Sequence, residues 1–169
     1  MAARQGFRIA AIVLGVFGSN PAAAVECSQD KGVYEDRDQA YELRFAPVES
    51  EASFATHTFK VEIRKSGQIL DGYVMPTDEV ERAGGILMNN CPDGDATGAE
   101  LDACTVWEGI LYAVDDKGVV ANLPNPGAAA AGQILLPDFG RSIRSSALWG
   151  EGKATVAPWD VLALKGCSQ

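Results

Sequence analysis

The amino-acid sequence predicts a mainly β protein, either a small antiparallel β-sandwich or a partly open barrel, with one or two short helices and two disulfides. Residues 58–65 alternate between apolar side chains on one face and charged side chains on the other, which is typical of a half-buried antiparallel strand. Turn signals at 66–68 and 115–118 each join two apolar runs and indicate two hairpins. The chain also contains four cysteines, an even number that suits a disulfide framework.

The other elements follow in chain order from the same rules. Residues 28–38 are charged and predict a surface lead-in, whereas 39–48 place Tyr41, Leu43 and Phe45 on one face of a strand. Further along we expect a return strand at 69–75, a short helix at 78–83 ended by Gly84 and Gly85, and a strand at 86–88. A central hairpin is expected at 105–123, followed by an exposed connection at 124–132 and an apolar run at 133–136. The chain then predicts a helical turn from Asp138 to Arg144 and a strand pattern at 153–164 that is interrupted by Pro158.

The amino terminus has the layout of a secretory signal peptide. Arg4 and Arg8 precede an apolar run at 9–17, and three alanines end the segment. The alternative is a membrane anchor, but this run is too short to cross ~30 Å of hydrocarbon at ~1.5 Å per residue. We therefore expect a cleaved signal peptide at 1–24, one mature β-rich domain at 25–169, no membrane anchor, and a periplasmic or secreted location.

The charge balance argues against two classes of partner. The formal net charge is −9, and 22% of the residues are charged. An acidic surface repels phosphate backbones, so nucleic-acid binding is not expected. The same repulsion disfavours binding to anionic lipid headgroups.

The cysteines predict two cross-links, because export would place them in an oxidising compartment. We expect Cys91 to pair with Cys104, which closes a short loop, and Cys27 to pair with Cys167, which joins the two ends of the mature chain. The alternative is a metal–thiolate site, but the cysteines lack the C-x-x-C spacing that is typical of zinc sites.

The loop inside the first of these cross-links suggests a metal site. Its candidate oxygen ligands are Asp93, Asp95, Thr97 and Asp102. The first three of these residues, followed by Gly98, resemble the start of an EF-hand-type calcium loop. The resemblance covers only this loop and then fails, because Cys104 stands where the twelfth position needs a bidentate glutamate. A solvated turn rich in Asp and Gly explains the same residues, so we expect no cofactor, with calcium as the alternative.

Candidate catalytic residues are few. His57 is the only histidine, no G-x-S-x-G elbow is present, and a zinc site with three histidines is impossible. Paired carboxylates could form a glycosidase-like site. The acids available for it are Glu108, Asp115, Asp116, Glu151 and Asp160. A periplasmic hydrolase that uses paired carboxylates is therefore the alternative function.

The tryptophans favour a binding function instead. Trp107 lies in a densely apolar run and is expected in the core, whereas Trp149 and Trp159 are candidates for exposed binding residues. The sequence thus predicts an exported binding or interaction protein, not an enzyme. Its partner would be an envelope protein or a small ligand, and binding or inhibition of a cell-envelope protein would fit.

Overall fold

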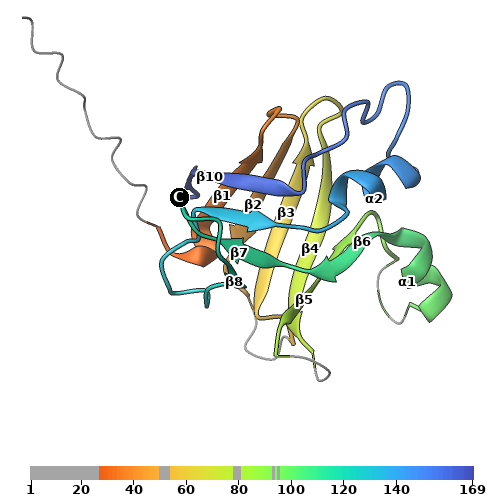
Figure 1. The fold of residues 1–169 in the computed structure, drawn as a ribbon. Coiled ribbons are helices and arrows are strands. Elements are labelled where there is room, and N and C mark those ends of the chain that lie inside the picture. The colour runs from red at the N-terminus through yellow and green to blue at the C-terminus, as the bar shows by residue number, and fades with distance from the viewer. Residues whose placement is uncertain (1–26, 50–53, 78–80, 93, 95) are drawn as a thin grey trace, which may run out of the picture.

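A computed structural model describes residues 27–49, 54–77, 81–92, 94 and 96–169. Within these ranges the chain forms one antiparallel sheet of ten strands that curls into a half-barrel, with two short α-helices (Figure 1). The mainly β prediction is confirmed, in its barrel-like form. The elements are η1 (Gln29–Lys31), β1 (Gly32–Asp36), β2 (Tyr41–Ala46), β3 (His57–Ile63), β4 (Gln68–Pro76), β5 (Ala83–Met88), α1 (Gly98–Cys104), β6 (Thr105–Ile110), β7 (Tyr112–Val114), β8 (Val120–Asn122), β9 (Gln133–Leu135), α2 (Phe139–Ser145) and β10 (Val161–Cys167).

One continuous stretch of chain brings the two ends of the sheet together. The strand order is β6-β5-β4-β3-β2-β1-β10-β9-β7-β8. β6 and β7 are consecutive in sequence and are separated only by the buried Leu111. Ile110 pairs with Gly84 on β5, whereas Tyr112 pairs with Leu135 on β9. The segment 105–114 therefore bridges strands that stand far apart in the sheet order.

The core lies inside the curl and is filled by alternate residues of the strands. The predicted inward face of β2 is confirmed, because Tyr41, Leu43 and Phe45 are each at most 1% exposed. On β3, Val61 is fully buried. Trp107 is also in the core, as expected, and its indole N–H donates to the carbonyl oxygen of Pro137. This packed interior fixes the strands whose outer faces carry the site described below.

The expected surface lead-in at 28–38 is wrong over most of its length. Residues 32–36 form β1, which pairs with both β2 and β10, and Tyr34 is fully buried. The charged residues at the end of β1 concealed the strand pattern. Asp36 is only 2% exposed, and one of its carboxylate oxygens accepts two backbone N–H bonds.

The expected helix end at Gly84 and Gly85 is also wrong, because both glycines lie inside β5. The ring of Trp107 on the neighbouring strand lies against Gly85, where a Cβ would be 2.9 Å from the ring. A glycine in a strand often marks such a close approach. Half of the predicted helix, residues 78–80, falls outside the described residues; of the other half, residues 81–82 form a bend and Ala83 begins β5.

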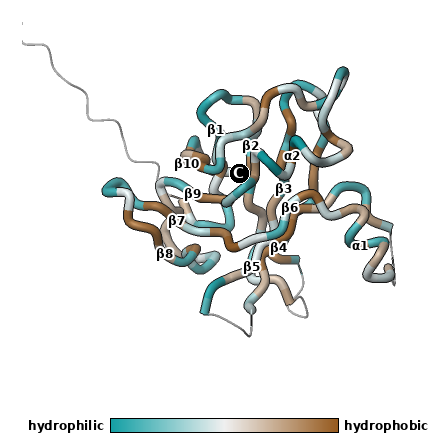
Figure 2. Tube along the Cα trace, turned by 45° about the vertical axis from the view of Figure 1, so that its right-hand side comes forward, coloured by the Kyte–Doolittle hydropathy of each residue, from teal (hydrophilic) through white to brown (hydrophobic). Residues whose placement is uncertain are grey.

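The second predicted hairpin forms, but not at the centre of the sheet. β7 pairs with β8 across a turn at residues 115–119, where Asp115 accepts two backbone N–H bonds. β8 is the last strand in the sheet order and lies beside β7 (Figure 2). All three of its residues are exposed. Density of apolar residues alone did not distinguish an end strand from a central one.

The cysteines lie as the predicted pairings require. The Cys91–Cys104 disulfide is present, with a Cα–Cα distance of 5.2 Å, and it holds the end of α1 beside the loop that follows β5. Cys27 and Cys167 are in side-chain contact without a bond between the sulfurs, so the second disulfide stays a prediction.

The predicted signal peptide at 1–24 lies outside the described residues. None of the helices within the described ranges is long and apolar enough to cross a membrane.

Candidate functional site

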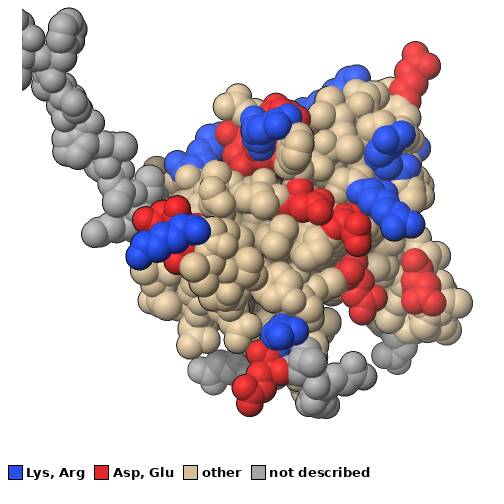
Figure 3. All heavy atoms as spheres, in the orientation of Figure 1, with Lys and Arg blue, Asp and Glu red and all other residues tan. Residues whose placement is uncertain are grey.

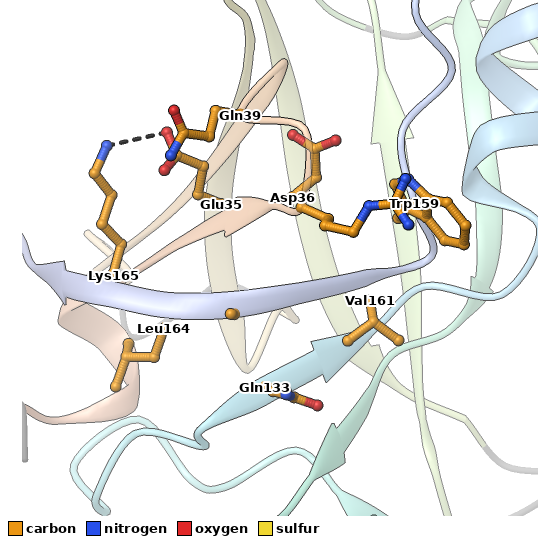
Figure 4. Close-up of a pocket in the computed structure, with 10 residues that line it drawn as sticks. Glu35, Asp36, Gln39, Gln133, Trp159, Val161, Leu164 and Lys165 are labelled. Carbon is orange, nitrogen blue, oxygen red and sulfur yellow. Dashed lines mark hydrogen bonds and ion pairs between the residues drawn. The ribbon is translucent and has the colours of Figure 1, made fainter.

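A groove of about 570 Å³ runs along the outer face of β10, between β1 and β9. We call it the β10 groove. The residues that line it include Arg37, Gln39, Gln133, Trp159, Val161 and Ala163. Figure 4 shows Trp159 at one end and the Glu35–Lys165 ion pair at the other, with Val161 and Gln133 between them. Because β10 is hydrogen-bonded on both sides, the strand that carries much of the groove is held in place.

Trp159 is the large aromatic residue of the groove and is held by two neighbours. The guanidinium carbon of Arg37 lies 3.9 Å from the ring centroid, and the indole N–H donates to Asp38 at 2.9 Å. Arg37 and Asp38 also form an ion pair at 3.2 Å. The hydrogen bond from the indole, followed by that from Arg37, lowers the pKa of the Asp38 carboxyl. Trp159 nevertheless stays 48% exposed, so an anchored aromatic residue faces solvent.

Asp36 shapes the turn that presents Arg37 and Asp38. One of its carboxylate oxygens accepts the backbone N–H of Ala40 at 2.7 Å and that of Tyr41 at 2.8 Å. This is the side chain-to-backbone bonding that makes Asp a turn residue. The other oxygen, Oδ2, is buried and has no hydrogen-bond partner among the described residues. The turn that positions the two anchors of Trp159 is thus itself fixed from inside the fold.

The backbone on either side of Trp159 is fixed by α2. Asp160 accepts the backbone N–H of Asp138 at 2.9 Å and that of Gly140 at 3.3 Å. Asp138 was expected to cap this helix and does occupy the capping position, but its side chain makes no cap hydrogen bond. Asp160 supplies the carboxylate there instead. Gly140 lies against Pro158, where a Cβ would be only 2.5 Å from the proline carbonyl oxygen.

The far end of the groove opens onto a network of ion pairs on the outer face of the sheet. The side chain of Glu42 is only 2% exposed, and its carboxylate forms ion pairs with Arg44, Arg64 and Lys165. Glu35 shares Lys165 with it, at 3.1 Å. Burial raises the pKa of Glu42, but the bonds from Lys165 and Arg44 outweigh burial and lower that pKa overall. The face of the molecule seen in Figure 3 likewise carries acidic and basic groups near one another.

This network gives a pH-dependent prediction. Because the folded pKa of Glu42 is below its ordinary value of 4.5, its contribution to stability is complete above about pH 4.5 and is lost as the pH falls through the folded pKa. Glu42→Gln should lower the free energy of unfolding at pH 7 by about 1–2 kcal/mol, since the partners are partly exposed. Urea unfolding at pH 7 and at pH 3 measures the difference, which should shrink in acid.

The control for this prediction is Glu62→Gln. Glu62 lies directly opposite Glu42 on the paired strand, but it is only half-buried. Its replacement should change the free energy of unfolding by about 0.5 kcal/mol or less. Equal effects of the two substitutions at pH 7 would contradict the assigned role of Glu42.

The structure separates the two tryptophans that were predicted to bind. Trp159 lines the β10 groove, whereas Trp149 does not. Trp149 is partly buried against the core, and Arg144 lies beside its ring at 5.4 Å from the centroid. Trp149 forms a bridge with Ala154, which closes the loop after α2. Only Trp159 is therefore kept as a site residue.

The candidate calcium ligands are only partly described. Asp93 and Asp95 fall outside the described residues. Thr97 caps α1 in a reciprocal pair with Glu100, and its hydroxyl donates to the Glu100 carboxylate at 2.7 Å. Asp102 is exposed on the same helix. The described residues contain no group of three or more His, Cys, Asp or Glu side chains that could hold a metal ion.

His57 is buried and engaged in hydrogen bonds. Its Nε2 lies 2.9 Å from the carbonyl oxygen of Pro124, and its Nδ1 lies 3.0 Å from the hydroxyl of Thr56. Burial lowers its pKa, which favours the neutral ring. A carbonyl oxygen only accepts, so Nε2 carries the proton. His57 thus links β3 to the connection that follows β8.

The sequence did not indicate most of the β10 groove. Trp159 was a candidate, but Arg37, Gln39 and Gln133 have no distinguishing pattern and lie far from it in the chain. They meet because β10 lies between β1 and β9. Comparison with protein-family models, curated proteins and solved structures finds no match for this chain.

Proposed function

We propose that the protein is an exported binding module that engages a small ligand or an envelope partner through the β10 groove. The observation that carries the proposal is the state of Trp159, which is anchored by Arg37 over its ring and by Asp38 at its indole N–H and is yet half-exposed at the groove. Aromatic residues of this kind dominate the energetics of binding surfaces. Export is supported by the predicted signal peptide and by a disulfide, which is typical of oxidising compartments.

The anchoring of Trp159 also favours affinity. Ordering a flexible side chain on binding costs about 0.5–1.5 kcal/mol. Arg37 and Asp38 already hold the ring within the fold, so this cost is largely absent. The apolar side chain of Val161, which is 38% exposed, lies in the same groove and offers further area for contact.

The alternative, a hydrolase with paired carboxylates, has less support at this groove. Such an enzyme needs one protonated and one ionised carboxyl facing the substrate. Glu35 is paired with Lys165 and Arg64, and Asp36 accepts backbone N–H bonds with one of its oxygens. Asp160, one of the acids proposed from the sequence, accepts backbone N–H bonds at the start of α2.

The test is a ligand screen that reports on Trp159. Purified ¹⁵N-labelled protein is mixed with panels of short peptides, oligosaccharides and cell-envelope fragments, and the three indole N–H signals are followed by NMR. We expect a ligand that shifts the Trp159 signal and leaves that of the buried Trp107 in place. Trp159→Ala should weaken its binding at least tenfold, about 1.4 kcal/mol, while Trp149→Phe should not change it.

Two outcomes would count against the proposal. A ligand whose affinity is unchanged in Trp159→Ala would place binding elsewhere. Turnover of a panel oligosaccharide into shorter products, detected by chromatography, would favour the hydrolase instead.

A further inference from the structure

We infer that the ligand of the β10 groove is an uncharged oligosaccharide, which stacks on Trp159 and hydrogen-bonds to the side-chain amides of Gln39 and Gln133. This inference rests on the proposed function and names the ligand class for the same site. The groove contains an apolar strip and neutral polar groups that have no hydrogen-bond partner among the described residues, and these features determine which ligand it can bind.

The apolar strip is narrow and is built from small side chains. Val161 and Ala163 are alternate exposed residues of β10 and line the groove together with Trp159. Alternate residues of a strand stand about 6.6 Å apart, which is similar to the width of one sugar ring. An aromatic ring beside small aliphatic side chains matches the C–H face of a sugar, which is flat and apolar. A large apolar side chain would instead need a deep pocket.

The groups available for new hydrogen bonds are neutral. The side-chain amides of Gln39 and Gln133 line the groove and have no hydrogen-bond partner among the described residues. Each amide offers donors and an acceptor, which suits hydroxyl groups because these also donate and accept. An uncharged ligand with many hydroxyls satisfies both amides.

The exposed charged groups of the groove already have partners, and Oδ2 of Asp36, which has no partner among the described residues, is buried. Lys165 is paired with Glu35 at 3.1 Å, and Arg37 is paired with Asp38 and stacked on Trp159. A strongly acidic or basic ligand would have to break these pairs. The groove therefore favours a neutral ligand.

An extended peptide is the competing ligand, and the topology argues against it. Peptides that bind to sheets commonly add a strand to an exposed edge, where main-chain hydrogen bonds supply the affinity. Where β10 carries Val161 and Ala163, its edges are occupied, because β9 pairs with residues 161–163 and β1 pairs from residue 162 to residue 167. A peptide lying on this groove would have no strand edge there with which to pair.

The experiment titrates four probes into ¹⁵N-labelled protein. They are tri-N-acetylchitotriose, cellotriose, the acidic trigalacturonic acid, and the uncharged peptide acetyl-Ala-Leu-Ala-amide. We expect at least one neutral trisaccharide to shift the Trp159 indole signal and the side-chain amide signals of Gln39 and Gln133. Trp159→Ala should weaken that binding at least tenfold, and Gln133→Leu, which removes one set of hydrogen bonds, about fivefold. Melting curves check that both variants fold.

Val119→Ala is the matched control, because Val119 is an exposed apolar residue outside the groove, and it should leave binding unchanged. Stronger shifts with the acidic sugar, or no shift with either neutral sugar, would overturn the inference. Shifts of Trp159 with the peptide alone would also overturn it, yet would leave the proposed binding function standing. Binding of a neutral sugar that Trp159→Ala does not weaken would contradict both.

Discussion

Replacing Val61 with aspartate is expected to leave the protein largely unfolded at room temperature. Val61 is fully buried on β3, where it pairs with Leu43 on one side and Leu70 on the other. An unpaired charge at such a position costs several kcal/mol, and the lost apolar contacts add to this cost. Domains of this kind have only about 5–15 kcal/mol of stability in total. Circular dichroism and urea unfolding measure the loss directly.

The adjacent Glu62→Ala provides the comparison. Its side chain alternates to the outer face of the same strand and is half-buried. Surface substitutions usually change stability by about 0.5 kcal/mol or less, so this variant should melt close to the parent. Similar melting temperatures for the two variants would show that the strand faces the other way.

Preventing the predicted Cys27–Cys167 cross-link is expected to have the second-largest effect. Gly32 at the start of β1 pairs with Cys167 at the end of β10, and Cys27 reaches the same place. Burial, together with the neighbouring Cys167, raises the pKa of the Cys27 thiol to about 11. A bridge here would close nearly the whole chain, for which loop-closure entropy gives up to about 5 kcal/mol of stability. The double variant Cys27→Ser/Cys167→Ser should lose up to that amount in urea unfolding.

Thiol counting tests the bridge itself. Protein purified under oxidising conditions, then unfolded without reductant, should show no reaction with Ellman's reagent, and peptide mapping should link Cys27 to Cys167. The variant Cys91→Ser/Cys104→Ser is the comparison, with a shorter closed loop and a loss of about 3 kcal/mol. One or more reactive thiols per chain would rule out the second bridge.

The sequence predicted best where a single periodic pattern determined the structure. The alternation of β3 is regular and its inward face was correct, because a one-residue change in facing would have exposed every apolar side chain. β1 was missed because Glu35 and Asp36 look like surface residues. Asp36 is buried only because backbone N–H groups of the following turn satisfy one of its oxygens. Bonds of that kind arise from the turn and leave no periodic signal.

The candidate site was predictable only in part. Tryptophan is conspicuous in any sequence, so Trp159 could be proposed, but Trp149 was proposed with the same reasoning and lies partly buried. The partners of Trp159 come from the turn after β1, over a hundred residues earlier in the chain. Their meeting depends on β1 pairing with β10, and this pairing between distant segments is not visible in local patterns.

The pairing of β1 with β10 also determines when the protein can fold. Contacts between the first and last strands have the greatest sequence separation that the described chain allows, and proteins rich in such contacts fold slowly. During synthesis, β1 lacks one of its two neighbours until β10 has been made. An unpaired strand edge of that kind invites association with other chains. The β1 edge of the nascent protein is therefore open to such association until β10 is available to cover it.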